Sequence, residues 1–132
     1  MIELVVMTFA PRKFTTKSGK SILVGRNSRE NNYLTLKIAK PEDLFFHATD
    51  FAGSHVILQL DKDEFVSRVD LEEAALYAAY YSKGKGKKQV KVDYTYKKYV
   101  TKPRKAPAGL VEIEKFKTIK VTKEQMSTLV LG

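Results

Sequence analysis

Two runs of alternating residues, joined by a short loop, constrain the fold more than any other feature of the chain. In residues 44–48 and 55–60, large apolar side chains at every second position alternate with the residues between them. Side chains along a β-strand point to opposite faces in turn, so each run predicts a strand with one strongly apolar face. Because only a short loop separates the two runs, we expect them to form a hairpin.

The remaining sequence predicts a mixed architecture. Further strand-like segments lie at 2–7, 12–16, 21–25 and 90–94, around Tyr99, and within 111–121. Three pairs have the spacing of capping boxes at helix starts, namely Asn27 with Glu30, Asp70 with Glu73, and Thr122 with Gln125. The first helix should reach about Ile38, the alanine-rich second helix should stop at Gly84, and the short third helix should carry Met126, Leu129 and Val130 on one face. We expect one α+β domain over residues 1–132, with a largely antiparallel sheet and helices packed on one side.

Composition excludes several classes of function. The 132 residues are 43% hydrophobic and 30% charged, as in an ordinary globular protein, and they include no cysteine. Disulfides, thiol catalysis and thiolate metal sites are therefore excluded. The N-terminal sequence contains Glu3 and has too short an apolar run for a signal peptide or a membrane span. We expect a cytoplasmic protein with no membrane partner.

The excess positive charge is confined to residues 83–105. The formal net charge is +9, and this basic window holds ten Lys or Arg residues and one acid, Asp93, so it accounts for the whole excess. Six of the seven tyrosines lie in the window or just before it. Lysines neutralise phosphates and tyrosine rings stack on bases, which favours nucleic-acid binding. A solvated basic loop beside tyrosines of the core explains the same composition equally well.

The two histidines raise the question of catalysis. If the hairpin is symmetric about Phe51, His47 and His55 are cross-strand neighbours on the face away from the main core. Ser54 and His55 are adjacent and point to opposite sides, so they do not form a nucleophile–base pair. Two histidines are too few for a metal site. We therefore expect hydrogen-bonded hairpin residues, no catalytic residue and no metal, with Gly53 supplying an unusual backbone angle.

Six short blocks follow one another in a specific order over residues 21–121. They are Gly25-Arg26-Asn27, Asn31-Asn32, residues 43–47, Gly53-Ser54-His55-Val56, Ala79-Tyr80-Tyr81-Ser82 and Val92-Asp93-Tyr94-Thr95. In this order and spacing they resemble the NFACT-R domain, which occurs in ribosome-quality-control factors, in related bacterial proteins once called fibronectin-binding, and as a solo module. The resemblance implies an RNA-binding domain with no chemistry and no cofactor of its own. Phe45 stands where the family typically has Trp, so a stacking role for this ring is a weaker expectation.

The leading hypothesis is a non-catalytic RNA-binding module that binds tRNA or rRNA, with the large ribosomal subunit as a candidate partner, in ribosome quality control or tRNA modification. The expected contact residues are Arg26, Asn27, His47, His55, Lys83, Lys85, Lys87, Lys88, Tyr94, Tyr96, Lys97, Lys98, Lys102, Arg104 and Lys105. Gly84 and Gly86 let the backbone approach phosphates, or they only end the helix and loosen the loop.

Several alternatives stay open. Asn27 and Arg26 form a structural pair if Asn27 caps the helix and Arg26 holds Asp43 or Asp93. A DNA-binding module fits the same charges. An RNA-processing enzyme that uses His47 and His55 as acid and base is a second class, and a module that docks on an acidic protein is a third.

Overall fold

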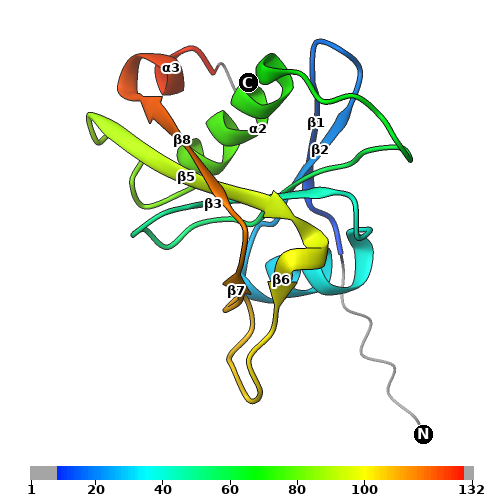
Figure 1. Cartoon of the computed structure of the whole chain (residues 1–132). Coiled ribbons are helices and arrows are strands. Elements are labelled where there is room, and N and C mark those ends of the chain that lie inside the picture. Colours follow the sequence, from blue (N-terminus) through cyan, green and yellow to red (C-terminus); the bar gives the residue numbers. More distant parts are fainter. Residues whose placement is uncertain (1–8, 130–132) are drawn as a thin grey trace, which may run out of the picture.

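The computed structural model describes residues 9–129, and over this range the chain forms a six-stranded antiparallel sheet (Figure 1). The strands are β1 (Arg12–Thr15), β2 (Ser21–Val24), β3 (Leu44–Ala48), β4 (Val56–Leu58), β5 (Gln89–Tyr96) and β8 (Lys117–Thr122), in the spatial order β1-β2-β4-β3-β5-β8. A small separate hairpin of β6 (Val100–Thr101) and β7 (Glu112–Ile113) projects beside the sheet. The α+β class is confirmed, and the predicted strand at 2–7 lies outside the described residues.

The hairpin of β3 and β4 has the register that its alternation predicts. Leu44 pairs with Leu58 and Phe46 pairs with Val56, so the hairpin is symmetric about Phe51. Because the register sets which side chains share a face, the side chains of His47 and His55 meet across the two strands, with ring centroids 5.7 Å apart. The predicted pairing of the two histidines is therefore confirmed.

Helices cover both faces of the sheet, rather than one face as the sequence predicts. The helix α2 (Arg68–Tyr80) and the short α3 (Lys123–Ser127) pack on one face, where four alanines of α2 with no exposed surface allow it to lie close to the strands. The helix α1 (Ser28–Tyr33) continues as a π-helical turn over Leu34–Ile38, and Leu34 of this turn packs on the other face with Phe45 and Ile57. The second apolar cluster formed there includes Val100 at the start of β6.

The helix starts confirm two of the three predicted caps. Thr122 and Gln125 form a reciprocal capping box, and Asn27 Oδ1 accepts from Glu30 N at 2.9 Å. The third prediction is wrong, because α2 starts with a capping box of Ser67 and Asp70 rather than of Asp70 and Glu73. The same carboxylate of Asp70 also binds Lys20 Nζ at 2.9 Å, so a contact with the β1–β2 turn holds Asp70 inside the first turn of the helix.

The second helix ends at Tyr80, four residues before the predicted stop at Gly84. The reason for glycine at position 84 is packing, since a Cβ there would lie 2.7 Å from the ring of Phe51. Gly86 has φ of +96° and faces open space, as expected for a turn. Over residues 9–129, no helix has both the length and the apolar character that crossing a membrane requires.

Candidate nucleic-acid interface

The loop between β3 and β4, residues 49–55, separates two hollows of similar size. We call the first, of about 380 Å³, the cationic hollow. It is lined by Arg12, Arg26, Asn27, Ser28, Asn31, Ala52, Gly53, Ser54, Tyr80, Tyr81, Ser82 and Lys83. We call the second, of about 390 Å³, the histidine cavity. It is lined by Phe45, His47, Ala48, Thr49, Asp50, His55, Asp93, Gly109, Leu110, Val111 and Ile113. Adjacent residues Ser54 and His55 line different hollows, which confirms that they point to opposite sides.

The cationic hollow combines basic side chains with tyrosine rings at the end of α2. The Arg12 guanidinium lies 4.5 Å from the ring centroid of Tyr81, and Lys85 Nζ lies 3.8 Å from that of Tyr80. Lys83 completes the basic lining, and none of the described lining residues is acidic. Cations held over aromatic faces keep their charge directed at the surface, so the hollow attracts anions.

Arg26 has a structural partner that the sequence interpretation did not include. The prediction that it holds Asp43 or Asp93 is wrong, because its Nε and Nη2 bind the buried carboxylate of Glu30 at 3.0 and 2.9 Å. The hydrogen bond from Arg26 lowers the pKa of Glu30 to about 2, so Glu30 stays ionised. The Arg26 side chain is still 39% exposed, and its Nη1 takes no part in these bonds, so it retains a donor for a ligand.

Gly53 lies at the base of the cationic hollow, but its backbone angle is ordinary. The left-handed residue of this loop is Asp50, with φ of 66°, so the prediction of an unusual angle at Gly53 is wrong. Glycine is required because a Cβ would lie 2.8 Å from Ser82 Cβ and 3.1 Å from Tyr81 O. The loop is tied to the end of α2 by the hydrogen bond from Ser54 N to Tyr81 O.

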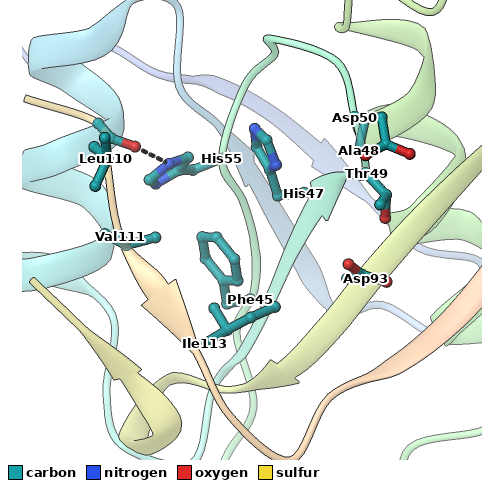
Figure 2. A pocket seen from close by; sticks show the side chains of 11 residues that line it. Phe45, His47, Ala48, Thr49, Asp50, His55, Asp93, Leu110, Val111 and Ile113 are labelled. Atoms are coloured by element: carbon teal, nitrogen blue, oxygen red, sulfur yellow. Dashed lines mark hydrogen bonds between the residues drawn. The ribbon is translucent and has the colours of Figure 1, made fainter.

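His55 is a structural residue of the histidine cavity. It is 2% exposed, and both ring nitrogens are engaged, Nδ1 with Thr35 Oγ1 at 2.7 Å and Nε2 with Gly109 O at 2.9 Å (Figure 2). Burial lowers its pKa to about 4, with a further contribution from His47. The expectation of a hydrogen-bonded hairpin residue is confirmed, and a ligand would reach His55 only by opening these bonds.

His47 and Asp93 form the polar base of the histidine cavity. They are direct partners across β3 and β5, and Thr118 Oγ1 donates to Asp93 Oδ1 at 2.6 Å. Burial lowers the pKa of His47, with smaller opposing contributions from the Gly53 backbone and Asp93. The imidazole is therefore neutral at pH 7, with one ring nitrogen that donates and one that accepts. Over the described residues, no three side chains of the metal-ligating types come together.

Most basic residues of the window lie at the two ends of β5, with only the exposed Lys91 within the strand. Lys83, Lys85, Lys87 and Lys88 are exposed before β5, beside the cationic hollow. The basic residues that follow β5 lie at its other end, about 23 Å away at 3.3 Å per residue. There Lys98 Nζ binds Glu42 at 3.0 Å and lies over the rings of Tyr96 and Tyr99. The basic residues of the window therefore form two groups at opposite ends of β5, and their contact with a phosphate backbone stays a prediction.

The other predicted contact residues have different surroundings. Tyr94 is half-buried and stacks on Phe46 against the core beneath α2, whereas Tyr96 is 40% exposed. Lys102 Nζ binds the carbonyl oxygens of Pro107 and Leu110 within the β6–β7 loop, so it stabilises this loop. The remaining members of the window lie on the surface, half-buried at Lys97 and exposed at Arg104 and Lys105.

Two parts of the site were not predicted from the sequence. Arg12 comes from β1, far along the chain from the basic window, and no spacing in the sequence connects them. Asp93 was considered as the single acid of the window and as a partner of Arg26, but its cross-strand partner is His47. The adjacent rings of Tyr80 and Tyr81 were visible in a sequence block, but their position beside Arg12 depends on where α2 ends.

An antiparallel α+β fold that presents a basic, aromatic hollow is the architecture of a small nucleic-acid-binding module, and comparison with known proteins identifies which one. The NFACT protein RNA binding domain matches residues 10–115. The chain belongs to this family.

Two relatives of the chain come from Bacillus subtilis and Streptococcus suis. The chain is 39% identical over 109 residues to the Rqc2 homolog RqcH of Bacillus subtilis, which covers 83% of this chain and 19% of that protein. The corresponding protein of Streptococcus suis is 39% identical over 115 residues, covering 85% of this chain and 20% of that one. The chain thus spans about a fifth of the length of these relatives.

A solved structure has the same fold. It is the C-terminal part of the fibronectin/fibrinogen-binding protein FBPS from Streptococcus suis, with a TM-score of 0.83 and 33% identity. The match covers 98% of this chain and 52% of that one.

Proposed function

We propose that the chain is a non-catalytic RNA-binding module of ribosome quality control, with tRNA or rRNA as its ligand and the cytoplasm as its location. The observation that carries the proposal is the cationic hollow, in which Arg12, Arg26 and Lys83 surround a surface without acidic lining residues. Arginine binds phosphate through a planar fork of donors, and exposed lysines add charge that releases counterions from the nucleic acid.

The lysines that follow α2 extend this surface. Lys83, Lys85, Lys87 and Lys88 are exposed within six residues of each other and lie directly after the tyrosines of the hollow. Phosphates bound there would place the attached nucleotides beside aromatic rings, the combination that single-stranded RNA sites use. The exposed Tyr96 and Lys98 at the far end of β5 are a second, smaller contact.

The proposed setting comes from the relatives. The Bacillus subtilis and Streptococcus suis proteins are both Rqc2 homologs, and the matching region of each is a part of a longer chain. We assign to this chain only the RNA contact, because the match spans about a fifth of the length of those relatives. The alternative of His-dependent RNA cleavage is disfavoured by His55, whose two ring nitrogens are already bonded within the protein.

The proposal is tested by measuring affinity for tRNA and for an rRNA fragment at several salt concentrations. With about four to six phosphate contacts, the log–log slope of affinity against salt is about −3 to −5. Replacing Lys83, Lys85, Lys87 and Lys88 by Ala should weaken binding to every RNA and flatten the slope by up to about 1 per lost contact. Double-stranded DNA as a competitor distinguishes an RNA module from the DNA-binding alternative.

A matched control removes the same charge elsewhere. Lys17, Lys37, Lys62 and Arg68 are exposed and lie outside both the basic window and the strand β8 that pairs with it, so their replacement by Ala should change affinity less and leave most of the slope. Equal effects of the two quadruple variants would mean that only net charge matters, and the proposed site would be wrong. Wild-type binding by the first variant would equally reject it.

A further inference from the structure

The histidine cavity has a mixed lining that the electrostatic account of RNA binding leaves unexplained. Figure 2 shows the apolar side chains of Leu110, Val111 and Ile113 on one side of the cavity. The acids Asp50 and Asp93 lie on the opposite side. Such an arrangement suits a flat ligand that packs an apolar face on one side and directs hydrogen-bond donors to the other.

The charge of this lining argues against phosphate. Among residues 9–129, the charged side chains that line the cavity are Asp50 and Asp93, and both are acidic, in a protein whose net charge is +9. Carboxylates repel phosphate and accept hydrogen bonds from N–H groups. A donor-bearing group therefore fits where an anion does not.

A hydrogen bond from Thr118 holds the carboxylate of Asp93 in a fixed position in the cavity. The Oδ1 of Asp93 accepts this bond, and a carboxylate has acceptor positions beyond the one used. His47 lies directly across the strand pair, and its neutral imidazole, which also interacts with the Gly53 backbone, adds a second polar group. The base of the cavity therefore presents an ordered row of hydrogen-bonding groups.

The apolar side is open at its rim. Leu110 is 47% exposed although it lines a cavity, which leaves apolar surface available to a ligand. The loop that carries Leu110 is fixed by the Lys102 ammonium on its carbonyl oxygen at 3.0 Å and by the bond between His55 and Gly109. The surface that a ligand would meet is thus already formed.

We infer that the histidine cavity binds one unstacked nucleobase with an exocyclic amino group, guanine above all, through Asp93, an inference that rests on the RNA binding proposed above. Guanine presents two adjacent N–H donors on its Watson–Crick edge, which match the two oxygens of a carboxylate. Uracil presents one donor between two carbonyl oxygens, which a carboxylate repels. Only residues 49–55 separate this cavity from the cationic hollow, so one RNA strand can place a phosphate in the hollow and a base in the cavity.

The test uses uridine decamers that carry one central guanosine or one central inosine. Inosine lacks only the amino group, so the two RNAs have the same charge and nearly the same shape. A hydrogen bond to a charged group discriminates by roughly tenfold or more, so we expect the guanosine RNA to bind about tenfold more tightly. Asp93→Asn, which replaces one acceptor oxygen by an amino group, should reduce this ratio to within about twofold.

The matched control is Asp50→Asn. It removes a carboxylate from the same cavity, and asparagine tolerates the left-handed angle at this position, so the ratio should stay close to that of the wild type. The comparison of the two RNAs on the wild-type protein needs no substitution, so it is decisive even if Asp93→Asn does not fold.

The outcomes separate this inference from the proposed function. If the wild type bound both decamers with equal affinity and a steep salt dependence, the base site would be rejected while RNA binding would stand. The acidic lining would then be explained by contact with a cationic side chain of a protein partner. A ratio unchanged by Asp93→Asn would reject the role of Asp93. Failure of both decamers and of tRNA to bind at low salt would overturn the proposed function and this inference with it.

Discussion

The cationic hollow and the histidine cavity lie on either side of one loop, yet they differ in almost every physical property except size. The hollow holds the cations Arg12, Arg26 and Lys83, whereas the charged residues of the cavity are Asp50 and Asp93. A net charge of +9 therefore does not describe a uniformly positive surface.

The difference shows how a small domain separates two kinds of recognition. Phosphate contacts position a nucleic acid and depend on salt, whereas base contacts specify its sequence and depend on directed hydrogen bonds. A carboxylate that binds a base repels phosphate, so a base site built on Asp93 is favoured by separation from the phosphate site. The cationic hollow and the histidine cavity lie on opposite sides of residues 49–55. One RNA strand can therefore reach both sites, although their charged residues stay separate.

As the pH falls, the histidine cavity should lose its contribution to folding stability before the cationic hollow does. This is the largest effect that we expect. The pKa of His55 is about 4 in the folded protein against an ordinary 6.5, so the unfolded state takes up a proton first as the pH falls. The stability that comes from keeping His55 neutral is fully present above pH 6.5 and is lost as the pH falls from 6.5 to 4. At about 1.36 kcal/mol per pH unit, the loss in the free energy of unfolding is about 3 kcal/mol. Glu30, beside the hollow, has a pKa of about 2 against 4.5, so its contribution is lost only below pH 4.5.

Thermal melting of the wild type and of His55→Gln at pH 7.5 and pH 4.5 measures this. The wild type should lose more stability than the variant over this interval, because only the wild type carries the His55 imidazole, whereas His47 is present in both. Equal losses would contradict the assignment of the acid sensitivity to the histidine cavity.

Gly53→Val should force the β3–β4 loop away from the end of α2. The free energy of unfolding should fall by about 1–3 kcal/mol, as is usual for overpacking. The added side chain would meet the backbone of Ser82 and Tyr81 at about 3 Å, where neither has room to move. The melting temperature should fall by several degrees. Ala52→Val introduces the same residue at the neighbouring exposed position and should have little effect, so similar melting of the two variants would refute the packing argument.

Thr49→Val should have the smallest effect. Thr49 lines the histidine cavity, and its Oγ1 is buried without a hydrogen-bond partner among residues 9–129. Replacing an unpaired hydroxyl by a methyl group of the same shape removes no bond, so the stability should stay within about 0.5 kcal/mol or rise slightly. The preference for guanosine over inosine should also persist. A clear loss of either would show that the hydroxyl has a partner in the working protein.

Alternation along the chain predicted the β3–β4 hairpin and the meeting of His47 with His55, because a register that buries one apolar face leaves no other pairing. The start of the second helix was assigned wrongly to Asp70 with Glu73, because the pair found in the structure, Ser67 with Asp70, has the same spacing. The contact of Asp70 with Lys20, from a turn 50 residues earlier in the chain, decides between them in the folded protein.

The functional site was predicted only in the parts that are local in sequence. The exposure of Lys83, Lys85, Lys87 and Lys88 followed from their composition. The cationic hollow itself joins β1, the start of α1, the β3–β4 loop and the end of α2, and these come together only through the strand order. Arg26 was assigned the wrong acid for the same reason, because charge alone does not identify which carboxylate is near.

The most direct test of the division between the two hollows is the salt dependence of tRNA binding by two double variants. Arg12→Ala/Lys83→Ala removes two cations from the hollow and should flatten the log–log slope by up to about 2. Asp50→Asn/Asp93→Asn removes two anions from the cavity and should leave the slope at the wild-type value, since neither residue contacts phosphate. If the first variant kept the wild-type slope, or if the second changed it as much as the first, the assignment of phosphate to one hollow and base to the other would be wrong.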